Sequence, residues 1–161
     1  MGARHMTLDE HCNLVGRLMV NLQSLEFALR AFLQSLPSAR PIGMPHGTDF
    51  YSFPAGTELP ENEITSYDTL AVLIRKFNTE MVTRGEPAID VTIVDVRDAL
   101  AHGRVSASTP DGTLRLIKFS KPDKQNRVRV VFNEQMTQTW LKDQIRRVHE
   151  AILTVHKLIP E

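Results

Sequence analysis

Apolar residues recur at alternating intervals of four and three residues in four separate stretches of the chain, and this repeat limits the fold more than any other feature. It is clearest in the first stretch, residues 8–36, where the series runs Leu18, Leu22, Leu25, Leu29, Phe32 and Leu36. Such spacing places the apolar side chains along one side of a helix, which must then pack against other helices. The chain is therefore predicted to be mainly α-helical.

The same spacing predicts three further helices, over residues 66–84, 87–102 and 133–159. The third of these is rich in Val and Ile and would also suit a strand, but its period favours a helix. Residues typical of helix ends bound the four ranges: Thr7 with Glu10 as a capping box and Pro37 for the first, Ser66 and Gly85 for the second, Pro87 and Gly103 for the third, Asn133 and Pro160 for the last.

Two stretches lack the helical repeat. Residues 37–65 carry five prolines and are predicted to form a long loop. Such a loop in a compact domain is either a functional segment or a partly ordered insertion. Residues 104–132 contain three short β-leaning runs, 105–108, 114–120 and 127–132, separated by turn sequences at 109–112 and 121–124. We expect a four-helix bundle with a small antiparallel β meander inserted before the last helix. It forms one domain over residues 6–161, with residues 1–5 interpreted as a vector remnant.

Composition excludes several classes of function. The 19 basic and 19 acidic residues cancel, which argues against a polybasic nucleic-acid coat but permits a local basic site. The single cysteine, Cys12, excludes an intrachain disulfide and a CxxC zinc site and fits a cytoplasmic protein. No apolar run approaches the roughly 20 residues of a membrane span. The sequence has no nucleotide-cradling loop, and His149 and His156 are too far apart for a typical metal pair, so we expect no cofactor and no metal.

One segment combines residues suited to catalysis, Arg97-Asp98-Ala99-Leu100-Ala101-His102-Gly103 at the end of the third predicted helix. Asp98 and His102 are four residues apart and share a helix face, whereas Arg97 points roughly 140° away from His102. Histidine can transfer a proton near neutral pH, and a guanidinium binds phosphate through a fork of N–H donors.

This segment resembles the motif of the HEPN superfamily (higher eukaryotes and prokaryotes nucleotide-binding), in which an Arg followed by a polar residue precedes a His near the end of a bundle helix. The resemblance implies an endoribonuclease that needs no metal, with Arg97 and His102 as catalytic residues and Asp98 orienting them. It also implies a homodimer that builds one shared cleft, RNA as substrate, and a role in toxin–antitoxin systems or antiphage defence with an antitoxin or other partner protein. Small HEPN toxins often carry a Tyr two residues after the His, where this chain has Arg104.

The predicted meander is rich in cations, among them Arg104, Arg115 and Lys118, which we expect to contact the RNA backbone. The alternative is a solvated hairpin whose cations protect sheet edges. For the whole chain, the alternative is a HEPN-like module that binds RNA or a protein, or dimerises, without catalysis.

Overall fold

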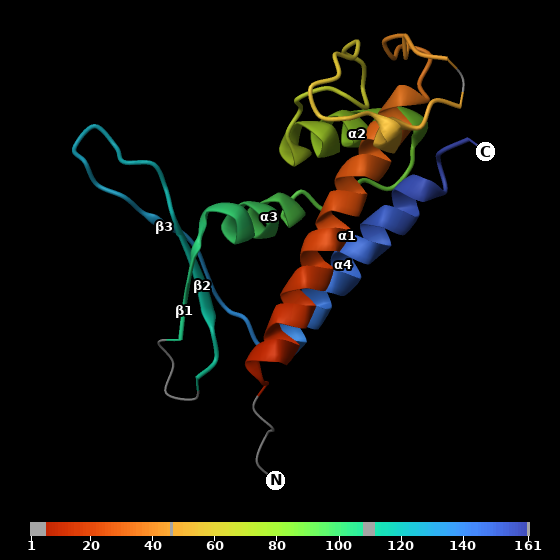
Figure 1. The fold of residues 1–161 in the computed structure, drawn as a ribbon. Coiled ribbons are helices and arrows are strands. Elements are labelled where there is room, and N and C mark those ends of the chain that lie inside the picture. Colours follow the sequence, from red (N-terminus) through yellow and green to blue (C-terminus); the bar gives the residue numbers. More distant parts are fainter. Residues whose placement is uncertain (1–5, 46, 108–111, 161) are drawn as a thin grey trace. The chain divides into compact units, whose positions relative to one another are not determined.

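The computed structural model describes residues 6–45, 47–107 and 112–160. These residues form four α-helices, a short 3-10 helix and a three-stranded antiparallel sheet that precedes the last helix (Figure 1). The predicted mainly α fold with a β meander is thus confirmed. The chain divides into two compact units, one built from residues up to Leu25 and Asp90–Ile152, the other from Glu26–Ile89 and the residues after Ile152. A single domain over residues 6–161 stays a prediction.

The first helix, α1 (Leu8–Gln34), begins as the sequence predicted. The Thr7 backbone N–H donates to Glu10 Oε2 at 2.8 Å, and the Glu10 N–H donates to Thr7 Oγ1 at 3.1 Å. This reciprocal pair is the expected capping box, and it satisfies two donors that a helix start leaves free. The helix ends two residues before the predicted boundary.

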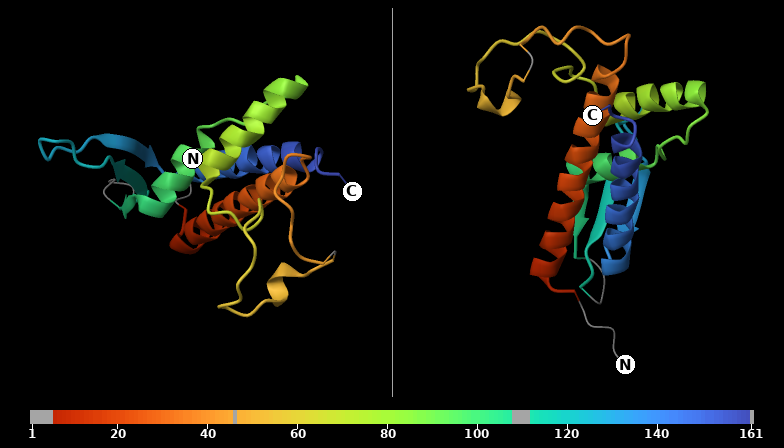
Figure 2. Two further views of the ribbon diagram at one scale, coloured as in Figure 1. Left: turned by 90° about the horizontal axis from the view of Figure 1, so that it is seen from above. Right: turned by 90° about the vertical axis from the view of Figure 1, so that its right-hand side faces the viewer.

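In the first unit, α1 packs against α4 (Gln138–His156), and Figure 2 shows the two helices side by side from two further directions. The predicted stripes supply most of the core, in which each of the following side chains is less than 9% exposed: Leu14, Leu18, Leu22, Leu25, Leu141, Val148 and Ala151. Leu14 and Ala151 lie outside the predicted repeat. Burial of these stripes is the main reason that both helices form here.

The prediction that Asn133 caps α4 is wrong. Asn133 lies in a strand opposite Ile117, and its side chain accepts a hydrogen bond from Arg115 at 2.8 Å. Strand pairing continues as far as the Met136 N–H, which donates to the Leu114 carbonyl oxygen. The helix starts after it, where Thr137 Oγ1 accepts from the Trp140 N–H at 3.1 Å. Cross-strand bonding thus overrides the local capping preference.

The third helix, α3 (Ile93–His102), begins six residues after the predicted start at Pro87. Asn78 accounts for the delay, because its amide donates to the Ile89 carbonyl oxygen and accepts from the Ile89 N–H, both at 2.8 Å. These bonds hold the Ile89 backbone in place of helical partners. Asp90 then accepts from the Thr92 N–H in a local turn that leads into the helix.

In the second unit, α2 (Leu70–Arg84) ends as predicted at Gly85, whose φ of 69° suits a left-handed helix cap. It starts four residues later than expected, at Leu70, and Thr69 is its cap residue. Ser66 is wrong as the start, because its carbonyl and hydroxyl oxygens both accept from the Arg30 guanidinium. The Leu70, Leu73, Phe77 and Met81 side chains are at most 1% exposed and form the core of this unit with Phe32.

The sheet has the order β1 (Arg104–Ser106), β2 (Arg115–Phe119), β3 (Val130–Gln135), with neighbouring strands antiparallel. The third strand begins and ends three residues later than the predicted run 127–132. The predicted turn at 109–112 falls mostly outside the described residues.

Between Pro37 and Thr65, the only regular element among the described residues is the 3-10 helix η1 (Phe50–Ser52), so the long loop is confirmed. Among the described helices, none is long and apolar enough to span a membrane.

Candidate functional site

The motif residues lie on the exposed side of α3. Ile93, Val96 and Ala99 are at most 5% exposed and fix the inward side of the helix. Asp98 and His102 stand away from that stripe, and His102 occupies the last position of the helix, where its side chain is exposed. An exposed imidazole at a helix end can reach a ligand in solvent, which a proton-transfer group requires.

Gly103 allows the α3 end to approach the sheet closely. Its N–H closes the helix by donating to the Ala99 carbonyl oxygen at 2.7 Å. A β-carbon at position 103 would lie 2.9 Å from the Ile117 carbonyl oxygen and 2.9 Å from Leu116 Cδ1. These separations are too short for a side chain, so the glycine sets the distance between His102 and strand β2.

Asp98 links the helix to the sheet. Its Oδ1 accepts from Arg97 Nη1 at 3.2 Å, and its Oδ2 lies 3.6 Å from Lys118 Nζ on β2. All three side chains are partly exposed, so the pairs orient the groups more than they stabilise the fold. Among the described residues, no hydrogen bond joins Asp98 to His102; Lys118 takes the position that the helix spacing suggested for the imidazole.

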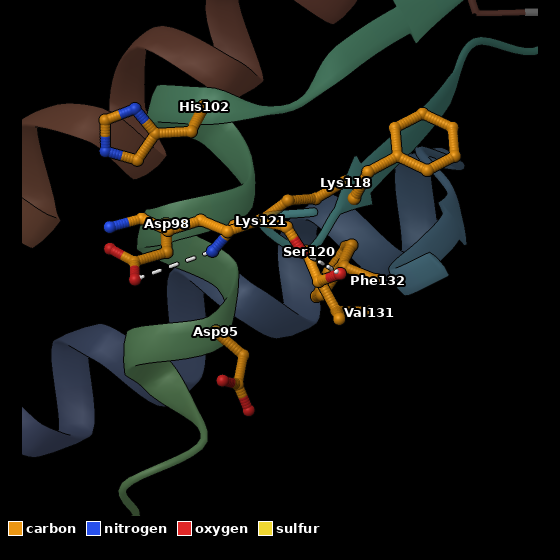
Figure 3. A pocket seen from close by; sticks show the side chains of 9 residues that line it. Asp95, Asp98, His102, Lys118, Ser120, Lys121, Val131 and Phe132 are labelled. Carbon is orange, nitrogen blue, oxygen red and sulfur yellow. Dashed lines mark hydrogen bonds and ion pairs between the residues drawn. The ribbon is translucent and has the colours of Figure 1, made fainter. Parts of the chain in front are cut away.

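A pocket of about 680 Å³ lies between α3 and the strands, within the first unit (Figure 3). The helix contributes Asp95, Asp98 and His102, spaced three and four residues apart and therefore on one face. The sheet side contributes the remaining lining residues: Lys118, Phe119, Ser120, Lys121, Val131 and Phe132. The pocket thus combines an imidazole, two ammonium groups and two carboxylates with apolar side chains.

The structure separates the predicted site residues into two groups. Of the motif residues, Asp98 and His102 line the pocket with Lys118, whereas Arg97 is not among the lining residues described. Arg97 keeps its place beside the pocket through its bond to Asp98. A guanidinium has five N–H donors, so this bond leaves it able to hold a phosphate as well.

Arg104 and Arg115 belong to the opposite face of the sheet. Arg104 pairs with Ile117, and Arg115 is two residues from Ile117, so the three side chains share a face, while Lys118 points to the other. The Arg104 guanidinium lies 5.2 Å from the Phe119 ring centre, a cation–π distance. The predicted RNA contacts Arg104, Arg115 and Lys118 therefore do not form one surface.

Sequence reasoning assigned no site role to part of the pocket, namely Asp95, Phe119, Ser120, Val131 and Phe132. Asp95 had a usable signal, because it precedes Asp98 by three residues on the same predicted helix. The others had none, because their position beside α3 depends on the register of β2 and β3, which includes a shift between Lys118 and Phe119.

Neither a metal site nor a known relative adds to this description. Within residues 6–45, 47–107 and 112–160, no three His, Cys, Asp or Glu side chains are grouped so that they could hold a metal ion. Comparisons with protein-family models, curated proteins and solved structures find no match to this chain.

Proposed function

We propose that this chain is an endoribonuclease of HEPN type that cleaves RNA at a site built around His102 and shared between two copies of the chain. The observation that carries the proposal is the pocket, in which His102, Asp98 and Lys118 meet at the exposed end of α3. Transesterification of RNA needs a group that transfers protons, such as an imidazole, and a cation that binds the phosphate.

In the proposed reaction, the 2′-hydroxyl oxygen of the substrate attacks the adjacent phosphorus, and the bond from phosphorus to the 5′-oxygen breaks. A base takes the 2′-hydroxyl proton and an acid protonates the leaving oxygen, so atoms and charge balance. DNA lacks the attacking hydroxyl and cannot react in this way. The products are a 2′,3′-cyclic phosphate and a free 5′-hydroxyl.

Each side chain has a definite part in this proposal. His102 transfers one proton, and the partner's His102 would transfer the other, which is why one chain provides half of the site. Lys118 can exchange Asp98 for a phosphate oxygen, and Arg97 stabilises the charge that grows on the phosphoryl oxygens. Asp98 holds both cations at the pocket and acts as a positioning residue. The toxin or defence role is proposed from the sequence resemblance alone.

The test is cleavage of labelled RNA in EDTA by the wild-type chain and by Arg97→Ala and His102→Ala. We expect each substitution to reduce the rate at least about 100-fold, the range of general acid–base catalysis. His149→Ala and Arg17→Ala, which change side chains of the same type at exposed positions on α4 and α1, should retain activity. Equal rates in all five proteins would exclude His102 chemistry.

The shared cleft has its own measurement. Sedimentation velocity across a dilution series should show a dimer, and the specific cleavage rate should fall as the dimer dissociates. A monomer that cleaves at full rate would contradict the shared site. RNA binding without cleavage by any variant would favour the non-catalytic module instead.

A further inference from the structure

The pocket beside His102 is larger than a phosphate needs. Its volume of about 680 Å³ is enough for a whole nucleotide, and it continues from His102 along α3 to Asp95. The cations Lys118 and Lys121 line it together with the apolar side chains Val131 and Phe132 (Figure 3). An aromatic wall next to cations suits an unstacked base with its attached phosphate.

The two carboxylates of the pocket differ in their partners. Asp98 is paired with Arg97 and Lys118, so its charge is already balanced. Asp95, one turn earlier on α3, is exposed and makes no ion pair among the described residues. Asp95 is therefore the carboxylate that can accept hydrogen bonds from a ligand without breaking a contact of the protein.

A carboxylate offers two neighbouring acceptors and no donor. Guanine is the one RNA base with two adjacent donors on its Watson–Crick edge, the N1–H and the N2 amino group. Adenine and cytosine set one amino donor beside a ring-nitrogen acceptor, and uracil sets its single N–H between two carbonyl oxygens. Each of these three would place an acceptor against the second carboxylate oxygen, which is repulsive.

We infer that this pocket binds the base of a nucleotide next to the cleaved phosphate and that Asp95 selects guanine. The inference deepens the proposed function and rests on it for RNA as the natural ligand. In this arrangement the base stacks against the apolar wall, Asp95 reads its edge, and Lys118 and Lys121 hold the phosphate near His102.

The experiment measures binding of the four ribonucleoside 3′-monophosphates to the full chain by isothermal titration calorimetry, with no cleavage step involved. We expect guanosine 3′-monophosphate to bind at least about fivefold more tightly than each of the other three. Asp95→Asn keeps the side-chain size but replaces one acceptor by a donor, and it should remove this preference. Asp143→Ala, an exposed aspartate on α4, should keep it. Lys121→Ala should weaken all four nucleotides by a similar factor.

Every outcome separates the two proposals. Equal affinity for the four nucleotides, a guanine preference that survives in Asp95→Asn, or no binding at all would overturn the inference while leaving the cleavage assay to decide the proposed function. Guanine-selective binding that depends on Asp95, in a chain that cleaves no RNA, would support the base site and refute the nuclease.

Discussion

Gly103→Ala is the substitution whose effect the structure defines most sharply. The new β-carbon would collide with the Ala99 carbonyl oxygen and lie 2.9 Å from the Ile117 carbonyl oxygen. The Ala99 oxygen belongs to the last turn of α3, and the Ile117 oxygen belongs to the paired strand β2. Neither oxygen can move without disturbing these backbone hydrogen bonds. Relief of the clash would also disturb the 2.7 Å bond from the Gly103 N–H to Ala99.

The expected magnitude follows from these contacts. Overpacking costs about 1–3 kcal/mol, and the weakened hydrogen bond adds about 1 kcal/mol. Alanine restricts the unfolded chain more than glycine does, which offsets about 0.4–1 kcal/mol. We therefore expect a net loss of about 1–3.5 kcal/mol in the free energy of unfolding. With a urea dependence of about 2 kcal/mol per M, the unfolding midpoint should fall by about 0.5–1.7 M.

Gly16→Ala is the matched control, because it makes the same chemical change at an exposed position of helix α1, where an added β-carbon meets nothing within 4 Å. Alanine is the better helix former, so this variant should gain about 0.5–1 kcal/mol. The assay is urea unfolding followed by circular dichroism. An unchanged or raised midpoint for Gly103→Ala would refute the claim that glycine is needed for the close approach of α3 to the sheet.

Three further substitutions test other parts of the structure. Thr7→Ala removes the hydroxyl that caps α1 and should lower the free energy of unfolding by about 1 kcal/mol, measured by urea unfolding. Asn78→Ala leaves the N–H and carbonyl of the buried Ile89 without their partner and should cost about 2–3 kcal/mol in the same assay. Burial lowers the pKa of His11, so the unfolded chain binds more protons than the folded chain as pH falls below about 6.5. The contribution of neutral His11 to the free energy of unfolding should therefore be fully present above that pH and be lost below it. His11→Leu should show a smaller decline in urea midpoint between pH 7.5 and pH 5.

Each of these three predictions can be contradicted by a specific result. Asn13→Ala, an exposed asparagine on α1, controls for loss of the amide, and an equal effect at positions 13 and 78 would contradict the role of Asn78. A Thr7→Ala midpoint equal to wild type would mean that the α1 cap adds nothing to stability. A decline in acid that is as steep in His11→Leu as in wild type would show that His11 is not the responsible group.

The helices were predictable because their cores depend on a repeat that the sequence displays directly. Leu18, Leu22, Leu25, Leu29 and Phe32 are buried as the spacing requires, and so are Leu141, Val148 and Val155. Ile145 and Ile152 belong to the same repeat in α4 but are only partly buried. Helix starts were less predictable, since long-range bonds decide them. Asn78 holds Ile89 out of α3, Arg30 binds Ser66 ahead of α2, and β pairing extends past Asn133.

The candidate site was predictable only in its helical half. Asp98 and His102 share a face through local geometry, and the structure keeps them on one pocket wall. Lys118 joins them because of the strand register, which also sends Arg104 and Arg115 to the other side of the sheet. A charge-rich meander does not reveal which cations share a face until its pairing is known.

The end groups of the RNA products test the central claim most directly. RNA is incubated with the chain in EDTA, and the fragments are identified by mass spectrometry. A 2′,3′-cyclic phosphate with a 5′-hydroxyl, and no cleavage where the attacking nucleotide is replaced by its 2′-deoxy form, is the result expected for 2′-hydroxyl attack assisted by His102. Products with a 5′-phosphate, or cleavage at the 2′-deoxy position, would contradict it.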